Sequence, residues 1–296
     1  YWYTNEIGNE FNRETMKYLR PHLLEDALQW LATERPLVMA GCTDLYPTTQ
    51  SPSLDGPLLD ITALDSLRGI TRENGWRRFG AATTWDDVLQ ADLPPAYRML
   101  KQAAREIGAV QIQVSGTIGG NLCTASPAAD SVPCLMALDA EIELASVNGS
   151  RRLPLAACLT GPRQTALRPD ELLVAIHVPD HAEAGLSGFA KLGARRYLVI
   201  SIAMVAVRLV VAEGRIDRAA VSIGSCAPVA LRHDRLESLI AGCRLDDIDK
   251  LGAAAMPLMA DRRAPSDDIR ASAGYRRRAA AELAWRTIGS LCAEAA

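Results

Sequence analysis

The chain has 296 residues, of which 49% are hydrophobic and 23% charged, and its formal net charge is -3. This composition is that of an ordinary globular protein, and the length is long for one compact core but comfortable for two domains. The weak net negative charge gives no indication of a nucleic-acid partner, because nucleic-acid-binding proteins usually carry a basic face. No apolar run approaches the roughly 18–20 residues of a membrane span.

Seven cysteines are spread thinly along the chain, and no two are separated by only two residues. That spacing excludes zinc-ribbon and iron–sulfur ligand motifs. An odd number of cysteines in a long chain argues against a disulfide framework and predicts a cytoplasmic protein.

The polar stretch 1–15 lacks the apolar core of a secretory signal. Because Met16 resembles a natural start, we expect residues 1–15 to be an N-terminal extension.

The first half of the chain alternates short helices and short strands. Apolar spacing, caps and glycine breaks predict the following elements in chain order. They are a helix over Glu25–Ala32, strands over Leu37–Ala40, Leu58–Ile61 and Trp76–Gly80, a helix over Thr84–Ala91 capped by Thr83 or Thr84, and a helix over Ala96–Ile107 ended by Gly108.

A loop is expected from Gly116 to Asp130, and a mixed segment follows it. The predicted elements there are a helix over Ser131–Leu138 and extended segments at Glu141–Ala145, Arg151–Leu155 and Leu172–Val178. The interval 177–188 contains proline, glycine and serine but few large apolar residues, which indicates a domain boundary. We therefore expect one domain over residues 16–182 and a second over residues 183–296.

The second half has a different pattern, with strands first and helices afterwards. Strands are predicted at Gly188–Leu192, Ile200–Val211 and Ala219–Ile223, with a turn at Glu213 and Gly214, and helices at Ala230–Ala241, Asp246–Met259 and Ser272–Cys292. This order predicts a small antiparallel sheet with helices on one side. The fold class of the whole chain is therefore α+β.

Two glycine-containing loops are the most informative segments. One runs Thr117-Ile118-Gly119-Gly120-Asn121-Leu122 and is followed by Asp130; the other is Ala40-Gly41-Cys42-Thr43-Asp44-Leu45. Glycine lets a ligand approach the backbone, and successive exposed N–H groups bind anions. The pair predicts a ligand with two phosphates or a long polar spine, and Gly119→Val should abolish retention of the ligand by occupying phosphate space. Two ordinary tight turns would have the same composition, and that alternative stays open.

The other motifs of nucleotide and hydrolytic enzymes are missing. The chain has no Gly-x-Gly-x-x-Gly after a strand, no phosphate loop ending in Gly-Lys-Ser/Thr, no His-Glu-x-x-His helix and no Gly-x-Ser-x-Gly elbow. The four histidines are dispersed, so each is expected to be structural or solvated. The sequence thus predicts neither a catalytic residue nor a metal site.

Taken together, four segments resemble one family, the flavin-binding medium subunits of the molybdenum hydroxylases, which include carbon monoxide dehydrogenase and bacterial xanthine dehydrogenases. The segments are Ala40–Leu45, Thr117–Leu122 with Asp130, Phe189–Tyr197 and the C-terminal signature Pro265–Arg277. They occur in the family's order and span nearly the whole chain. The resemblance implies a two-subdomain FAD-binding domain of the vanillyl-alcohol-oxidase type, followed by a C-terminal domain with a three-stranded sheet and helices.

The same resemblance assigns the FAD-binding residues by position. The pyrophosphate would contact two loops, Asp130 the sugar or ribityl hydroxyls, and Lys191 and Tyr197 the flavin ring. The expected FAD-binding residues are Met39, Ala40, Gly41, Cys42, Thr43, Asp44, Leu45, Ile107, Thr117, Ile118, Gly119, Gly120, Asn121, Asp130, Leu173, Lys191 and Tyr197. Without the resemblance, Ile107 and Leu173 would be assigned to the core, and Lys191 to the surface.

Cys42 departs from the glycine that is usual at its position in the family. Its Cβ restricts a positive φ and adds bulk near the phosphates, so a shifted loop or weaker FAD binding is expected. An exposed thiol at such a turn would also be reactive.

As a function, the resemblance implies an oxidoreductase subunit that transfers electrons. Its partners would be a small iron–sulfur subunit and a large molybdopterin subunit, and its acceptor NAD⁺ or another oxidant. Two alternatives stay open, a free-standing flavin oxidase of the same fold and a scaffold subunit that has lost FAD. Cys42 is the only residue that favours the scaffold.

Overall fold

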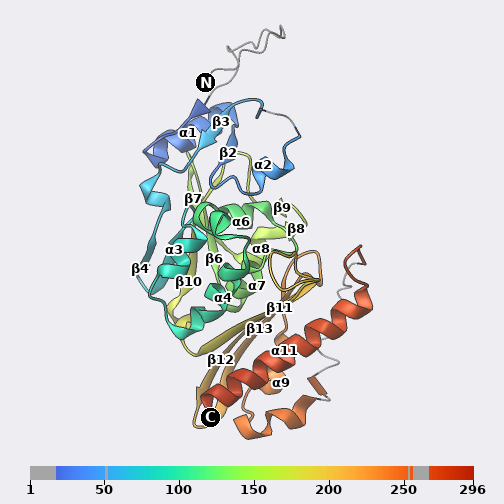
Figure 1. The fold of residues 1–296 in the computed structure, drawn as a ribbon. Coiled ribbons are helices and arrows are strands. Elements are labelled where there is room, and N and C mark those ends of the chain that lie inside the picture. The colour runs from blue at the N-terminus through green and yellow to red at the C-terminus, as the bar shows by residue number, and fades with distance from the viewer. Residues whose placement is uncertain (1–17, 51–52, 253, 256–266) are drawn as a thin grey trace.

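The computed structural model describes residues 18–50, 53–252, 254–255 and 267–296. Figure 1 shows three sheets in succession, from a small N-terminal sheet, through a central sheet covered by short helices, to a C-terminal sheet backed by one long helix. The predicted extension over residues 1–15 lies outside the described residues. The division of the chain after residue 182 stays a prediction.

A three-stranded parallel sheet in the order β1-β3-β2 forms the N-terminal part. Its elements are β1 Tyr18–Leu19, α1 Leu24–Glu34, β2 Leu37–Met39 and β3 Leu58–Asp60. Helix α1 buries Ala27, Leu28 and Leu31 against Leu59 and its neighbours. The predicted helix and strands of this segment are confirmed to within two residues at each end. The loop 40–45 follows β2 and lies at the boundary with the central part.

A five-stranded antiparallel sheet in the order β4-β5-β10-β6-β7 forms the centre. Its strands are β4 Ile70–Glu73, β5 Trp76–Gly80, β6 Glu141–Ser146, β7 Gly149–Pro154 and β10 Leu172–Pro179, and a small hairpin of β8 Leu159–Gly161 and β9 Gln164–Thr165 lies beside it. Every residue of the central strand β10 is buried, because helices cover one of its faces and the N-terminal part covers the other.

Short helices cover the central sheet and surround a core that includes Phe79, Trp85, Tyr97 and Leu135. They are α3 Trp85–Gln90, η2 Pro95–Tyr97, α4 Arg98–Glu106, α5 Val110–Ser115, α6 Ile118–Thr124, α7 Ser131–Ala137, α8 Leu155–Cys158 and η3 Asp180–Glu183. Two further short helices belong to the N-terminal part: η1 Asp65–Leu67, which packs on its core through Leu67, and α2 Leu45–Thr48, which buries no residue. Thr84 caps α3 through a reciprocal capping box with Asp87, as its position predicts.

The prediction of an unbroken loop from Gly116 to Asp130 is wrong, because helix α6 lies inside it. Two glycines lower the intrinsic preference for a helix. The helix forms nevertheless, because the Thr117 hydroxyl accepts a hydrogen bond from the Gly120 N–H at 3.0 Å. Ile118 and Leu122, four residues apart, anchor it in the core. Tertiary burial therefore overrides local propensity here.

A four-stranded antiparallel sheet in the order β11-β12-β13-β14 forms the C-terminal part. Its elements are β11 Leu186–Leu192, β12 Ala203–Ala212, β13 Arg215–Gly224, β14 Leu231–Arg232, α9 Asp234–Ile240, η4 Leu245–Leu251 and α11 Ala273–Ala295. The hairpin turn at Glu213 and Gly214 is confirmed, and both residues have positive φ. One sheet face packs on α11, whereas the other carries Ala206 and Ala220 into the central core.

Three details of this part differ from the sequence predictions. The sheet has a fourth strand, because Leu231 pairs with Ile223, and this pairing delays the predicted helix from Ala230 to Asp234. Where the predicted helix Asp246–Met259 overlaps Leu245–Leu251, the structure has a 3₁₀ helix. Part of the remaining predicted span lies outside the described residues. Helix α11 agrees with its prediction at the N-terminus and extends to Ala295.

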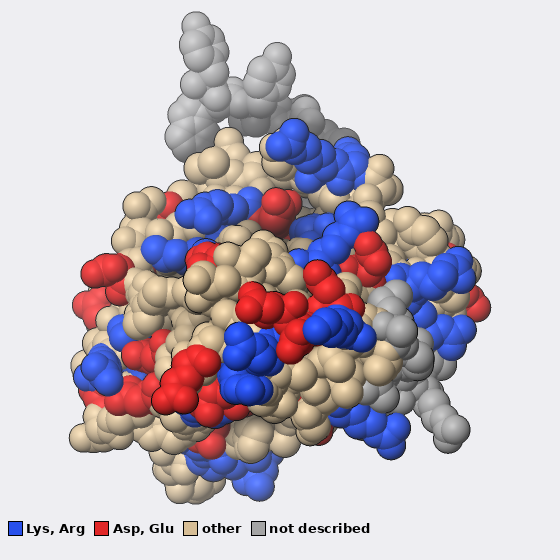
Figure 2. All heavy atoms as spheres, turned by 90° about the horizontal axis from the view of Figure 1, so that it is seen from below, with Lys and Arg blue, Asp and Glu red and all other residues tan. Residues whose placement is uncertain are grey.

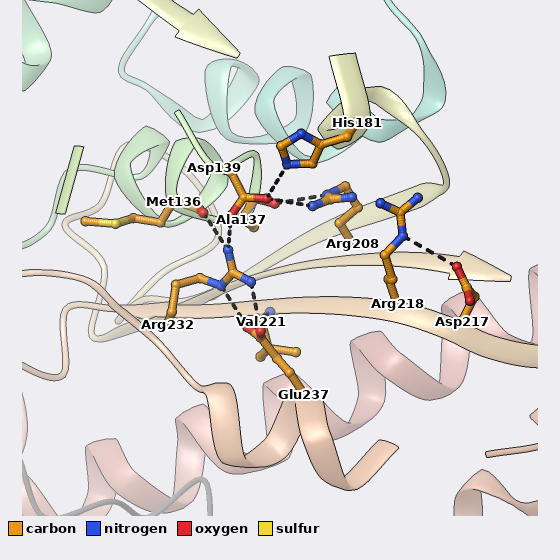
Figure 3. Close-up of polar contacts among 10 residues, drawn as sticks. All are labelled: Met136, Ala137, Asp139, His181, Arg208, Asp217, Arg218, Val221, Arg232 and Glu237. Atoms are coloured by element: carbon orange, nitrogen blue, oxygen red, sulfur yellow. Dashed lines mark hydrogen bonds and ion pairs between the residues drawn. The ribbon is translucent and has the colours of Figure 1, made fainter. Parts of the chain in front are cut away.

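Asp139 joins the C-terminal sheet to the central helices (Figure 3). Its carboxylate contacts Arg208 at 3.1 Å, Arg232 at 2.6 Å and His181 at 3.6 Å. The same two arginines donate to the last carbonyls of α7, Arg208 to Ala137 and Arg232 to Met136. The Met136 carbonyl also accepts from the Asp139 N–H at 3.1 Å, so this turn and the two arginines together satisfy the C-terminus of the helix. The contacts hold β12 and β14 against α7.

Charges of both signs are mixed on the outer surface at this end of the molecule. Figure 2, viewed from below, shows Lys and Arg side chains beside Asp and Glu over the described residues on that face. Neither sign dominates there, so this face creates no extended field of one sign that would attract a polyanion.

We predict that Asp139→Ala lowers the free energy of unfolding by about 1–3 kcal/mol, because it leaves the buried Arg208 and the half-buried Arg232 without their shared carboxylate. Urea denaturation measures the loss. Asp217→Ala is the matched control: it removes an exposed carboxylate that pairs with Arg218 on β13, and its effect should stay below about 0.5 kcal/mol. Equal losses for the two variants would contradict the role assigned to Asp139.

Candidate functional site: a cavity between two glycine loops

A cavity of about 580 Å³ lies where the loop after β2 meets the N-terminus of α6. This volume is within the range of small-molecule and cofactor sites. Twelve of the residues predicted from the sequence line it, and they come from four separate segments. They are Ala40, Gly41, Cys42, Thr43, Asp44, Leu45, Ile107, Thr117, Gly119, Gly120, Asn121 and Leu173.

The two loops are in direct backbone contact at Gly41. A Cβ built on Gly41 would lie 1.8 Å from the carbonyl oxygen of Ser115, and one built on Gly116 would lie 3.3 Å from Thr43 Oγ1. No side chain fits at Gly41 without displacing one loop. This glycine therefore permits the contact that brings segments about 75 residues apart to one cavity.

Gly119 has a role different from the one predicted. Its Cβ would point at Ala81, 2.7 Å from the backbone oxygen, and its N–H donates to that oxygen at 2.9 Å. The reason given for the Gly119→Val prediction is therefore wrong, because the added side chain would meet Ala81 and not a phosphate. A side chain at this position would instead separate α6 from the loop after β5.

Three residues of the first loop that line the cavity have backbone N–H groups without a protein partner in the part of the chain that the structure describes. Within the described ranges of the chain, the N–H groups of Gly41, Cys42 and Thr43 donate to no protein acceptor. In the second loop, the Thr117 hydroxyl accepts from Gly120, which leaves its own proton for a ligand. Both loops thus present donors of the kind that bind an anion.

The carboxylates that line the cavity are already neutralised. Asp44 contacts Arg163 at 2.6 Å, and Glu171 contacts Arg151 at 2.6 Å. The hydrogen bond from Arg151 holds the pKa of Glu171 below its usual value. Because each carboxylate has a cationic partner, an anionic ligand in the cavity is not repelled by unpaired negative charge.

Asp130 and Lys191 lie beside the cavity rather than in its lining. The Lys191 Nζ is 2.6 Å from one Asp130 oxygen, and the Ser201 hydroxyl donates to the other at 2.5 Å. All three are largely buried, and burial raises the pKa of Asp130 although Lys191 opposes that shift. Ser201 was not predicted from the sequence, because a serine before a strand of alanines and valines carries no signal of its own.

The other predicted residues lie elsewhere. Met39 and Ile118 are buried beneath the two loops. The Tyr197 ring is 60% exposed, and the Arg196 guanidinium lies 5.1 Å from its centroid. Ala81 and Trp85, which sequence reasoning missed, line the cavity from the loop after β5 and from α3. Their apolar side chains resemble any core residue, so only the fold reveals this role.

Cys42 adopts the left-handed conformation that the sequence analysis assigned to a glycine, with φ of 54°. Its Sγ donates to the carbonyl oxygen of Ala40 at 3.4 Å. Burial raises the pKa of the thiol above its ordinary value. A raised pKa keeps the thiol protonated at neutral pH, which argues against the reactive thiol expected for an exposed cysteine at this turn.

We predict that Cys42→Gly raises the free energy of unfolding by about 0.5–1 kcal/mol, because glycine removes the left-handed strain at some cost in chain entropy. Thermal and urea unfolding measure the change. Cys42→Ala keeps the Cβ and should give no such gain. If alanine stabilised the chain as much as glycine, the thiol and not the backbone would be responsible.

Neither a metal site nor a membrane-spanning helix is found in the part of the chain that the structure describes. No group of three or more His, Cys, Asp or Glu side chains gathers there in a way that could hold a metal ion. No described helix is long and apolar enough to cross a bilayer.

Known families match both halves of the chain. Residues 10–181 match the family described as "FAD binding domain in molybdopterin dehydrogenase". Residues 189–291 match the "CO dehydrogenase flavoprotein C-terminal domain".

Curated relatives are similar over nearly their whole length. The xanthine dehydrogenase FAD-binding subunit of Escherichia coli O157:H7 is 32% identical over 88% of this chain and 90% of its own. The glyceraldehyde dehydrogenase medium chain of Sulfolobus acidocaldarius is 31% identical over 88% of this chain and 92% of its own.

Solved structures share the architecture. A chain of the Cu,Mo-CO dehydrogenase in its cyanide-inactivated form has a TM-score of 0.83 at 26% identity, covering 94% of this chain and 98% of its own. A chain of quinoline 2-oxidoreductase from Pseudomonas putida 86 has a TM-score of 0.84 at 23% identity, covering 95% of this chain and 98% of its own, and at that identity it shows the fold alone.

Proposed function

The chain belongs to the family of FAD-binding medium subunits of the molybdenum hydroxylases, and from this premise we propose that it serves as the electron-transfer subunit of a multi-subunit dehydrogenase. FAD, when bound, supplies the redox chemistry that connects iron–sulfur clusters on a small partner chain to NAD⁺ or another external acceptor. The substrate would be oxidised on a large molybdopterin-containing partner chain.

The hydrogen-bond donors that line the cavity suit an FAD pyrophosphate. Gly41, Cys42 and Thr43, whose N–H groups have no protein partner among the described residues, and Thr117, with its hydroxyl, line the same cavity, and the cavity's carboxylates are paired. This convergence is the observation that carries the proposal. The apolar wall made by Ile107 and Leu173 suits the planar parts of the cofactor.

Asp130, Lys191 and Ser201 would contribute beside this cavity. Asp130 supplies acceptors for the cofactor's hydroxyl groups, and Lys191, which pairs with Asp130, orients that carboxylate beside the cofactor. We propose the remaining predicted residues Met39, Ile118 and Tyr197 as supports of the loops or of the ring. All seven cysteines are free thiols, which supports the cytoplasm as the compartment.

The FAD site is tested by titrating the full chain with FAD and following the visible absorbance and the flavin fluorescence. Thr117→Val should weaken FAD binding about tenfold, because it removes one hydroxyl from a charged ligand. Thr117→Ser keeps the hydroxyl and should bind as the wild type does. A wild-type chain that takes up no FAD would refute the flavoprotein function and favour the scaffold alternative.

The subunit role is tested by purifying the native assembly. Iron, molybdenum and two further chains should elute with this chain at constant ratio. Oxidation of an organic substrate by the isolated chain with FAD would instead establish the free-standing oxidase. Reduction of its FAD only when the partner chains and their substrate are present would support the electron-transfer subunit.

A further inference from the structure

Arg276, in the C-terminal signature, is a buried charge that holds two distant pieces of backbone. It lies in the first turn of α11, and only 3% of it is exposed. Its Nη1 donates to the carbonyl oxygens of Ile202 and Ser225, each at 2.7 Å. These residues mark the start of β12 and the loop that leaves β13. One guanidinium group therefore fixes the spacing between both segments.

Each of these segments continues into a contact with the residues that follow α6. Ser201, next to Ile202, donates its hydroxyl to Asp130 at 2.5 Å. The Ser225 N–H donates to the Pro127 carbonyl at 3.1 Å, and Ser225 has φ of 60°, so it needs support to keep its conformation. Ser126 and Ala129, on the same segment, line the cavity. The route from Arg276 to the cavity wall is thus only two contacts long.

Asp268 orients Arg276 from the other side. Its Oδ1 accepts from Arg276 Nη2 at 2.5 Å and from the backbone N–H of Arg270 at 2.8 Å. The backbone hydrogen bond and the arginine lower the pKa of Asp268 to about 2, so the carboxylate is ionised at neutral pH. Asp268 and Arg276 both belong to the signature segment, and neither lies in the cavity lining.

Arg276 is buried, whereas the Asp268 side chain is 34% exposed, so the pair only partly offsets the hydration that the guanidinium group loses. Burying an arginine here costs hydration free energy, so its hydrogen bonds to two backbone segments suggest a role other than stability. Resting on the FAD-binding function proposed above, we propose that Asp268 and Arg276 are positioning residues: they hold Ser201 on Asp130 and the Ser225 loop on Pro127, and so shape the wall of the flavin site. The C-terminal signature would act on the cofactor through these contacts.

Titration of the full chain with FAD tests the proposal. Arg276→Met keeps much of the side-chain volume and removes the donors, and the dissociation constant for FAD should rise about 10- to 100-fold, the range seen when groups that orient binding residues are lost. Arg286→Met is the matched control on the same helix, since Arg286 is 75% exposed and pairs only with Glu282 at the surface. Its FAD affinity should stay within about twofold of the wild type.

A double-mutant cycle separates positioning from general loss of stability. Ser201→Ala breaks the last contact of the route, and its effect on FAD affinity should be less than additive with that of Arg276→Met, because both variants release Asp130. The visible spectrum and midpoint potential of bound FAD should shift in both single variants. Asp268→Asn supplies a milder variant for the same measurements if Arg276→Met does not fold, and its FAD affinity should fall by a smaller factor.

Arg276→Met or Asp268→Asn protein that is folded by circular dichroism, and that binds FAD with unchanged affinity and spectrum, would overturn the inference while leaving the proposed function intact. Strict additivity with Ser201→Ala would also overturn it. A wild-type chain that binds no FAD would overturn the proposed function itself, and the inference with it.

Discussion

The close approach of two backbone segments at Gly41 is the constraint on which the site depends. A hypothetical Cβ there would lie 1.8 Å from the Ser115 carbonyl oxygen, so the contact exists only because residue 41 has no side chain. The first segment comes from the parallel N-terminal sheet, and the second runs into a helix on the central sheet (Figure 1). Their contact gathers unpaired N–H donors from one and a hydroxyl from the other around a single cavity.

The C-terminal sheet completes this arrangement through charged contacts and through packing. Arg208 and Arg232 end helix α7 and share Asp139, while Lys191 and Ser201 reach Asp130 at the other end of the same helix. Asp130 and Asp139 flank α7 on its two sides in the sequence. Contacts at both ends of this helix therefore fix the position of the C-terminal sheet relative to the flavin-binding part.

This architecture agrees with a protein that positions a cofactor. The cavity offers backbone donors, paired carboxylates and apolar walls. In such a protein, the side chains bind and orient the cofactor and set its electrostatic environment. The buried Arg276 and the paired Lys191 are examples of charges held by geometry rather than exposed for reaction.

The sequence by itself determined the family, the α+β fold class and the two loops, because glycines, hydroxyl residues and an aspartate at those spacings are local features. It also placed most helices and strands, since periodicity and caps act over a few residues. Only the tertiary structure decided that Thr117–Asn121 begins a helix, that Gly119 packs on Ala81, and that Asp130, Lys191 and Ser201 meet. These outcomes depend on burial and on contacts between residues far apart in the chain, which no local pattern encodes.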